Sequence, residues 1–248
     1  MMNKKLIAFD VDGTISLSRS KIDSEMADLL KQLLQVKQVA LITGGAFADI
    51  KRQVLDEIGL DNPFNKNLTL LPTNGGGFWI FTEKWLEISS HKLTIEEKEK
   101  IIKILEEIDA GDPELCDNKS YGREIQDRES QITYAAYGED APQELKQAWD
   151  PDFKKRISLQ NKLMEKLPEF EVKIGGTTSI DITSKGMDKA YAMNKLMKYF
   201  NLEKKDIAFF GDAVYENGND YPVFLMNIDT VKVSGVEETK EIIRELLQ

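Results

Sequence analysis

A short apolar run near the start of the chain, Lys5 to Phe9, ends directly in the sequence Asp10-Val11-Asp12-Gly13-Thr14. Continuous apolar runs of this length are typical of strands that are buried on both faces of a parallel sheet. The two carboxylates follow at the carboxyl end of that strand, where open α/β sheets bind their ligands. One carboxylate can attack a phosphorus atom while the other manages the proton on the leaving or entering oxygen. Taken alone, the segment is explained equally well by a strand and an ordinary Asp-Gly turn.

The rest of the first third alternates strand-like and helix-like segments. Apolar residues recur at helical spacing from Met26 to Leu34, and an apolar run from Gln38 to Ile42 ends at Thr43-Gly44-Gly45. A helix is predicted over Phe47 to Ile58 and a third strand over Leu68 to Leu71. Repeated strand–helix units with short links predict an α/β fold with a doubly wound parallel sheet.

The middle of the chain has a different pattern, in which two helices alternate with two pairs of strands. The first helix is predicted from Thr94, which forms a capping box with Glu97, to about Ile108, and the second over Phe153 to Leu167. The four strands are predicted over Arg123–Asp127, Gln131–Ala136, Phe170–Ile174 and Ser179–Thr183. This order is typical of an α+β module with an antiparallel sheet.

From about Gly186 the strand–helix pattern returns. It predicts a helix over Asp188 to Phe200, a strand over Ile207 to Phe210 and a final helix over Glu237 to Leu247. We therefore expect a core domain made of residues 1–83 and 187–248, with an α+β cap domain inserted at residues 84–186.

The composition limits the possible partners. The chain has 248 residues, with 43 acidic against 33 basic side chains and a net charge of −10, which argues against nucleic acid as the main partner. No apolar run approaches the roughly 18 residues of a membrane span, so no membrane partner is expected. Cys116 is the only cysteine, which excludes an internal disulfide and fits a reducing cytoplasm. Because His91 is the only histidine, a metal ion would need oxygen ligands.

Further segments lie where they could complete a phosphate site. Gly211-Asp212 and Asn219-Asp220 add acidic groups after a second strand, and such groups can bind Mg²⁺ through oxygens. Thr43, before two glycines and a helix, can offer a hydroxyl and backbone N–H groups to a phosphate. Lys189 can neutralise the nucleophile and the phosphoryl group. Taken singly, these segments are a polar loop, a helix cap and a surface lysine, but their occurrence in this order is much less expected by chance.

This order resembles the four-motif signature of the haloacid dehalogenase superfamily over nearly the whole chain, and the insertion matches its second cap class. Within the superfamily, the segments look like those of eukaryotic-type phosphomannomutases. The matching segments are Asp10 to Ile22, Thr43-Gly44-Gly45, Pro72-Thr73-Asn74-Gly75, Ile174-Gly175-Gly176, Gly186-Met187-Asp188-Lys189 and Phe209-Phe210-Gly211-Asp212.

The resemblance implies Mg²⁺-dependent phosphoryl transfer through an aspartyl phosphate, with a hexose phosphate as the substrate. Asp10 is then the nucleophile and Asp12 the general acid/base, and the metal ligands are Asp10, Asp212 and the backbone carbonyl of Asp12. The substrate and its phosphoryl group are expected to contact Arg19, Thr43, Gly44, Gly45, Arg128, Ser179, Asp181 and Lys189. The resemblance also implies a homodimer joined through the cap domains.

One position departs from the mutase pattern. Glu139 stands after Gly138, where the mutases have an arginine, and Lys146 stands at a later arginine position. A mutase must retain a bisphosphorylated intermediate, and Glu139 would repel it, whereas a phosphatase needs only water. Phosphomannomutase and sugar-phosphate phosphatase therefore both stay open. A silent sensor of phosphorylated metabolites is the third alternative, although such a domain would be expected to lose its nucleophile.

Overall fold

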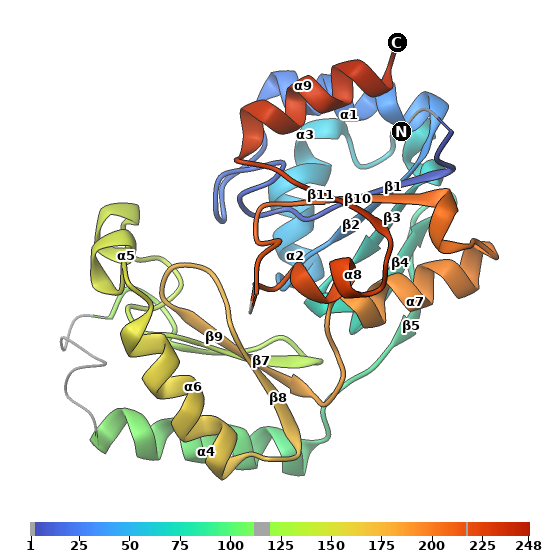
Figure 1. Ribbon diagram of the computed structural model, residues 1–248. Helices are drawn as coiled ribbons and strands as arrows, with labels where there is room; N and C mark the ends of the chain where they lie inside the picture. The colour runs from blue at the N-terminus through green and yellow to red at the C-terminus, as the bar shows by residue number, and fades with distance from the viewer. Residues whose placement is uncertain (1–2, 112–119, 217) are drawn as a thin grey trace. The chain divides into compact units, whose positions relative to one another are not determined.

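The chain forms two compact units in the computed structural model, which describes residues 3–111, 120–216 and 218–248 (Figure 1). The core unit consists of residues 1–90 and 187–248, and the insert consists of residues 91–186. The core extends past the predicted boundary after residue 83 because the strand β5 (Trp85–Ser90) pairs with β4 (Gly77–Phe81) in the core sheet. Cys116 lies outside the described residues.

The core sheet has seven strands in the order β11-β10-β1-β2-β3-β4-β5. The first five strands in this order are parallel, as the strand–helix pattern predicts, and β4 and β5 add an antiparallel edge that the sequence analysis missed. The parallel strands are β1 (Leu6–Phe9), β2 (Gln38–Ile42), β3 (Leu68–Leu71), β10 (Ile207–Gly211) and β11 (Asp229–Lys232).

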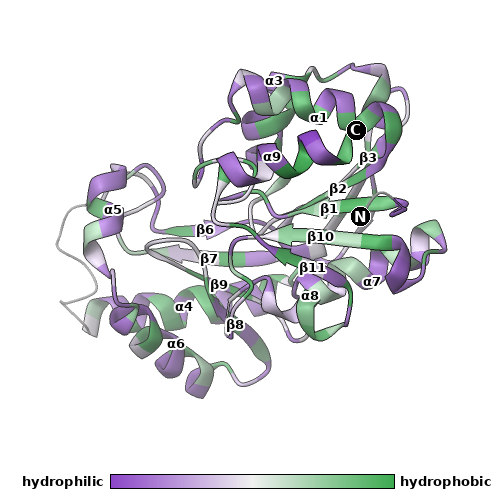
Figure 2. Cartoon of the chain, turned by 45° about the horizontal axis from the view of Figure 1, so that its top comes forward, coloured by the Kyte–Doolittle hydropathy of each residue, from purple (hydrophilic) through white to green (hydrophobic). Residues whose placement is uncertain are grey.

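Helices cover both faces of this sheet (Figure 1). One face, with Ile7 and Phe9 of β1, packs against α1 (Ser24–Val36) and α9 (Val236–Leu246). The other face, with Leu6 and Ala8, packs against α7 (Lys189–Phe200) and α8 (Tyr221–Leu225). Since both faces are covered, the central strands are apolar at nearly every position, which appears as green along β1 in Figure 2.

The segment predicted as one helix over Phe47–Ile58 is helical throughout but changes its hydrogen bonding in the middle. It consists of α2 (Phe47–Ile50), the π-helical turn η1 (Lys51–Leu55) and α3 (Asp56–Ile58). The described part of the core also contains the 3₁₀ turns η2 (Pro63–Asn67), η3 (Thr73–Gly75) and η4 (Lys204–Asp206). Apolar spacing does not distinguish a π-turn from an α-turn, so the π-helical turn was not predicted.

The insert has an antiparallel sheet in the order β6-β7-β9-β8. Its strands are β6 (Ile125–Asp127), β7 (Gln131–Ala135), β8 (Phe170–Ile174) and β9 (Ser179–Ser184). Its helices are α4 (Ile95–Gly111), α5 (Gln143–Trp149) and α6 (Lys154–Lys166). The apolar face of the sheet packs against α4 and α6, and the capping box of Thr94 and Glu97 begins α4. The α+β module is as the pattern predicts.

The carboxyl ends of β1, β2 and β10 lie side by side. In the register of the sheet, Phe9 pairs with Leu41 on one side and with Phe210 on the other. The residues that follow each strand therefore leave the sheet at one edge, and these are Asp10, Thr43 and Asp212. In the part of the chain that the structure describes, no helix has the length and apolar character needed to cross a membrane.

Candidate active site

Asp10 lies at this edge in a buried ionic cluster. Lys189, the first residue of α7, places its Nζ 2.5 Å from Asp10 Oδ1 and 2.5 Å from Asp220 Oδ1. Lys189 and Asp220 are fully buried, and Asp10 is 3% exposed. The helix begins here because the Asp188 carboxylate accepts a hydrogen bond from the Tyr191 N–H, as an N-cap does. The lysine is therefore a fixed charge inside the site and not a surface side chain.

Burial is the main influence on the ionisation of Asp10. It raises the pKa of the Asp10 carboxyl well above the ordinary value, Lys189 opposes it, and the Asp220 and Asp212 carboxylates add to the rise. Burial also lowers the pKa of Lys189, but Asp10 and Asp220 outweigh this and raise it above its ordinary value. The lysine stays charged, and it is the counter-ion that lets a carboxylate exist at this depth.

Asp212 brings a third carboxylate to the same place. One carboxylate oxygen from each of Asp10, Asp212 and Asp220 lies within 4.8 Å of the other two. Burial and the charge of Asp220 raise the pKa of Asp212. Gly13 makes room for this side chain, because a Cβ at Gly13 would lie 2.5 Å from Asp212 Oδ2 and the φ of Gly13 is +89°. When all are ionised, three carboxylates face one ammonium group, so the cluster has an excess of negative charge.

This donor set fits a divalent cation. Hard cations such as Mg²⁺ prefer carboxylate and carbonyl oxygens, and a bound cation would offset the repulsion that raises the pKa values here. Asn219 Oδ1, next to Asp220 in the chain, is buried with no hydrogen-bond partner among the described residues. Asp220 itself is less suited to direct ligation, because Lys189 occupies its Oδ1 and the Ala213 N–H donates to its Oδ2. Lys189 also occupies Asp10 Oδ1, but Asp10 Oδ2 accepts a long hydrogen bond from Thr14 Oγ1 at 3.4 Å, so Asp10 and Asp212 are the side chains best placed to hold a cation.

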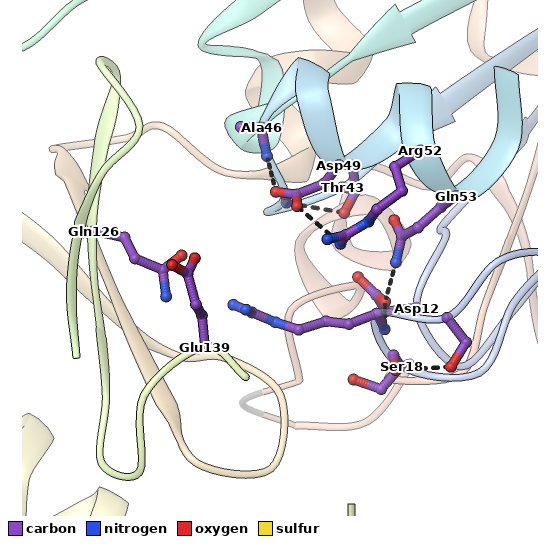
Figure 3. Close-up of polar contacts among 12 residues, drawn as sticks. Asp12, Ser18, Thr43, Ala46, Asp49, Arg52, Gln53, Gln126 and Glu139 are labelled. Atoms are coloured by element: carbon purple, nitrogen blue, oxygen red, sulfur yellow. Dashed lines mark hydrogen bonds and ion pairs between the residues drawn. The ribbon is translucent and has the colours of Figure 1, made fainter. Parts of the chain in front are cut away.

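The Asp12 carboxylate has hydrogen-bond partners outside the ionic cluster of Asp10, Lys189, Asp212 and Asp220. Its Oδ1 accepts a hydrogen bond from the backbone N–H of Arg19 at 2.5 Å and from Gln53 Nε2 at 3.1 Å (Figure 3). Arg19, which the sequence analysis selected for its side chain, thus also contributes its backbone, with a φ of 55°. Gln53 is 1% exposed and was not among the selected residues. The sequence offered no signal for it beyond a polar residue inside an apolar helix face.

Thr43, Gly44 and Gly45 form the turn from β2 to α2. Thr43 is 2% exposed, and its Oγ1 accepts a hydrogen bond from the Gly45 N–H at 3.0 Å. The Ala46 N–H is bound by Asp49 Oδ2 at 2.9 Å, which caps the helical segment (Figure 3). The hydroxyl and the backbone of this turn are thereby held at the same edge of the sheet as Asp10.

The next turn along this edge is strained. After β3, Thr73 and Asn74 have φ values of 48° and 53°, although a threonine rarely adopts this region. The two residues are fastened to the previous turn, since the Thr73 N–H donates to Gly45 O and the Asn74 N–H donates to Thr43 O, each at 2.8 Å. Strain of this kind costs about 1–3 kcal/mol per residue and collects at functional sites.

The remaining selected residues, Arg128, Ser179 and Asp181, belong to the insert. Asp181 Oδ1 accepts a hydrogen bond from Thr133 Oγ1 at 2.8 Å, and Arg128 donates to Gln126 Oε1 at 2.8 Å. Strand pairing aligns Gln126 with Thr133 and Thr133 with Asp181, so the three form a polar row on the face opposite the apolar core of the insert. The sequence analysis missed Gln126 and Thr133, although the alternation in β7 could have indicated this face.

Glu139 pairs with a neighbour in the insert. Its carboxylate lies 2.9 Å from Arg123 Nε, and Lys146 Nζ donates to the backbone carbonyl of Glu139 at 2.9 Å. The charge of Glu139 is therefore balanced locally by Arg123. This pair contributes no excess positive charge, unlike an arginine at this position.

A family model described as haloacid dehalogenase-like hydrolase matches residues 7–226. The chain belongs to the haloacid dehalogenase-like hydrolases. The predicted superfamily and fold class are confirmed, and the chain is an enzyme of the phosphotransferase kind. Solved structures of the same fold include an IMP-nucleotidase from Plasmodium falciparum, with a TM-score of 0.68 and 15% identity over 99% of this chain and 68% of that one. A haloacid dehalogenase-like hydrolase from Bacteroides thetaiotaomicron has a TM-score of 0.65 and 16% identity over 98% and 99% of the two chains.

Curated relatives of this chain include phosphomannomutases from several organisms. The phosphomannomutase of Spinacia oleracea is 29% identical over 87% of this chain and 84% of its own length. That of Encephalitozoon cuniculi is 26% identical over 99% of this chain and 94% of its own length. The similarity thus covers the insert as well as the core.

Proposed function

We propose that this chain is a Mg²⁺-dependent phosphohexomutase of the phosphomannomutase type, acting through an aspartyl phosphate on Asp10. The observation that carries the proposal is the cluster of the buried Asp10, Lys189 and Asp220 with the half-buried Asp212 at one edge of the core sheet. Buried charges are costly, so a protein that retains three of them beside the half-buried Asp212 has a functional reason to do so. The similarity to phosphomannomutases along both units supports the hexose phosphate as the substrate.

The chemistry follows from the positions of the groups. An Asp10 oxygen attacks phosphorus, the bond from phosphorus to the ester oxygen breaks, and the electron pair stays on that oxygen, which takes a proton from Asp12. In the second step a sugar hydroxyl gives its proton to Asp12 and attacks the phosphorus, and the electron pair returns to Asp10. Lys189 and the Thr43 turn balance the charge of the phosphoryl oxygens, which is the main requirement of phosphoryl transfer.

Mg²⁺ is the cation proposed for the carboxylate cluster, with Asp10, Asp212 and the backbone carbonyl of Asp12 as protein ligands. When bound, it supplies positive charge to the phosphoryl oxygens. Since Mg²⁺ binds only the folded chain, a concentration of 100 times its dissociation constant stabilises the fold by about 2.7 kcal/mol. We expect Asp212→Asn to lose this Mg²⁺-dependent rise in melting temperature. An equal rise in the variant and the wild-type protein would show that Asp212 is not a ligand.

The substrate contacts proposed in the insert are Arg128, Ser179 and Asp181, to which the polar row adds Gln126 and Thr133. Carboxylate, amide and hydroxyl groups in a row suit the hydroxyls of a sugar, and an arginine suits a phosphate because its fork binds two oxygens. The proposal also includes a homodimer joined through the insert and a cytoplasmic location.

The decisive experiment uses mannose 1-phosphate with Mg²⁺ and a trace of hexose bisphosphate as activator. The proposal expects mannose 6-phosphate as the product. Release of inorganic phosphate without isomerisation would exclude the mutase while keeping the aspartyl-phosphate chemistry. Binding of the ester without any turnover would point to a sensor and exclude both activities.

A sugar-phosphate phosphatase is the second candidate, and the Arg123–Glu139 pair favours it. A mutase must hold its bisphosphorylated intermediate through a second phosphate, and this pair offers that phosphate no net positive charge. Glu139→Arg provides a test. If the chain is a phosphatase because it has no arginine at position 139, the variant should lose hydrolysis and gain isomerisation. If the variant hydrolyses the ester as the wild-type protein does, Glu139 is not the cause of the phosphatase activity.

A further inference from the structure

Gln53 is a buried polar residue whose side chain is directed at Asp12. It is 1% exposed, lies in the π-helical turn η1, and places Nε2 at 3.1 Å from Asp12 Oδ1 (Figure 3). Gln53 belongs to none of the four motifs. A polar side chain at this depth is expected to have a partner, and here the partner is the carboxylate to which the acid/base role is assigned.

The backbone of Gln53 is tied to the same loop. Its carbonyl accepts a hydrogen bond from the Ile22 N–H at 2.9 Å, at the end of the segment that begins with Asp12. Gln53 therefore fastens both ends of this segment, one through its side chain and the other through its main chain. π-turns interrupt the regular helix and frequently occur at functional sites, which fits a residue that the helix must present in a particular direction.

The two donors on Asp12 select one of its oxygens. Oδ1 accepts from the Arg19 N–H at 2.5 Å and from Gln53 Nε2 at 3.1 Å. Both are N–H groups that can only donate, so Oδ1 is engaged as an acceptor and the acidic proton belongs on Oδ2. We infer that Gln53 is a positioning residue for phosphoryl transfer, which fixes the Asp12 carboxyl so that Oδ2 delivers and receives the proton. The inference rests on the proposed function, in which Asp12 is the general acid/base.

The role has a specific kinetic consequence. When Asp10 takes a phosphoryl group from a hexose bisphosphate, the departing sugar oxygen must gain the proton of Asp12 Oδ2. When the donor is 2,4-dinitrophenyl phosphate, the departing phenolate is stable without a proton. A displaced Asp12 therefore slows the first transfer and leaves the second nearly unchanged, because general acid catalysis acts only where the leaving group needs protonation.

The test compares single-turnover phosphorylation of the enzyme, with Mg²⁺ present, by glucose 1,6-bisphosphate and by 2,4-dinitrophenyl phosphate. Gln53→Met keeps the approximate size of the side chain and removes the donor, and Gln53→Glu keeps the shape and replaces the donor by an acceptor. We expect both variants to slow transfer from the bisphosphate by about tenfold or more, while transfer from the dinitrophenyl ester changes by less than about threefold.

Val54→Ala is the matched control. Val54 is fully buried in the same turn and has no hydrogen bond to Asp12, so its truncation loosens the turn and leaves the ratio of the two rates unchanged. Circular dichroism and thermal melting of each variant verify that it is folded. Equal slowing of both donors in the Gln53 variants, or no slowing of either, overturns the inference while the proposed function stands. No transfer from either donor in the wild-type protein overturns the proposed function and the inference with it.

Discussion

The carboxyl edge of the core sheet and the polar row of the insert hold their functional groups in different ways. In the core, Lys189 and Asp220 are fully buried, and the Lys189 ammonium group binds the carboxylates of both Asp220 and Asp10. In the insert, Asp181 and Arg128 are only partly buried, and each has a hydrogen bond with a neutral side chain, Thr133 for Asp181 and Gln126 for Arg128. In the core, the buried charged groups depend on one another and are fixed in one arrangement. In the insert, Asp181 or Arg128 can be substituted without leaving a buried charge unpaired.

This difference suggests a division of labour. An arrangement of buried charges is suited to one reaction and tolerates little change, because each charge depends on the others. Arg128 and Asp181 are partly exposed, and such groups can change their hydrogen bonds at little cost in stability. We therefore expect substitutions in the core to remove the reaction, and substitutions in the insert to alter the choice of substrate.

The largest effect is expected at Asp10, the proposed nucleophile. Asp10→Asn removes the attacking oxygen and should lower turnover to below about one part in a thousand, because loss of a nucleophile usually costs several orders of magnitude. Ser179→Ala changes the insert and serves as the comparison, because the enzyme should still become phosphorylated. The turnover of both variants is measured in the same steady-state assay. Residual activity of Asp10→Asn above that level would contradict a covalent mechanism.

The second effect concerns stability. Lys189→Met leaves two buried carboxylates without a counter-ion and should lower the free energy of unfolding by about 3–5 kcal/mol. Arg128→Met removes a partly exposed charge and should lower it by about 1 kcal/mol or less. Urea denaturation measures both. Equal losses in the two variants would remove the distinction between core and insert.

The third effect is on substrate binding. Arg128→Gln should raise KM for the hexose phosphate by about tenfold, since a charge-assisted hydrogen bond contributes roughly 1.5 kcal/mol. The rate of phosphorylation by 2,4-dinitrophenyl phosphate should not change, because that donor has no sugar to recognise. If both donors were affected alike, the insert would have a part in the reaction itself.

The smallest effect lies in the core but far from the reaction, where Lys240 joins α9 to α1. Its ammonium group binds Asp23 at 2.7 Å, and this hydrogen bond lowers the pKa of the Asp23 carboxyl. A lowered pKa stabilises the fold above the ordinary pKa of 3.8, and the contribution is lost as the pH falls through the lowered value.

Lys240→Met should therefore reduce stability at pH 7 by at most about 1 kcal/mol, because solvent screens the exposed Asp23 carboxylate. The difference from the wild-type protein should shrink below about pH 4. Thermal melting across this range measures it. A difference that did not depend on pH would assign the effect of Lys240 to packing.

Much of the core could be predicted from its sequence because two local patterns mark it, the apolar runs of the strands and the polar residues that follow them. The apolar runs of β1, β2 and β10 indicate strands, and polar residues directly after them indicate the carboxyl edge where Asp10, Thr43 and Asp212 meet. The antiparallel β4–β5 hairpin was missed because no strand was predicted there, and β5 is largely exposed and has no continuous apolar run.

Other features could not be predicted because they depend on contacts between distant residues. Gln53 meets Asp12 across a long stretch of chain through a π-turn that leaves no mark in the apolar spacing. Gln126 and Thr133 join Asp181 only through the register of two strand pairs. The positions of such residues depend on packing, and they include Gln53, which contacts the proposed acid/base carboxyl, and the two residues that complete the polar row.

The covalent step is tested most directly by locating the phosphoryl group. The wild-type protein is mixed with a hexose bisphosphate and Mg²⁺, quenched rapidly in acid, and digested for mass spectrometry. The account predicts an acid-stabilised phosphoryl group on the peptide that contains Asp10, and its absence when Asp10→Asn is treated in the same way. Turnover without any phosphorylated peptide, or with the phosphoryl group on another residue, would contradict the account.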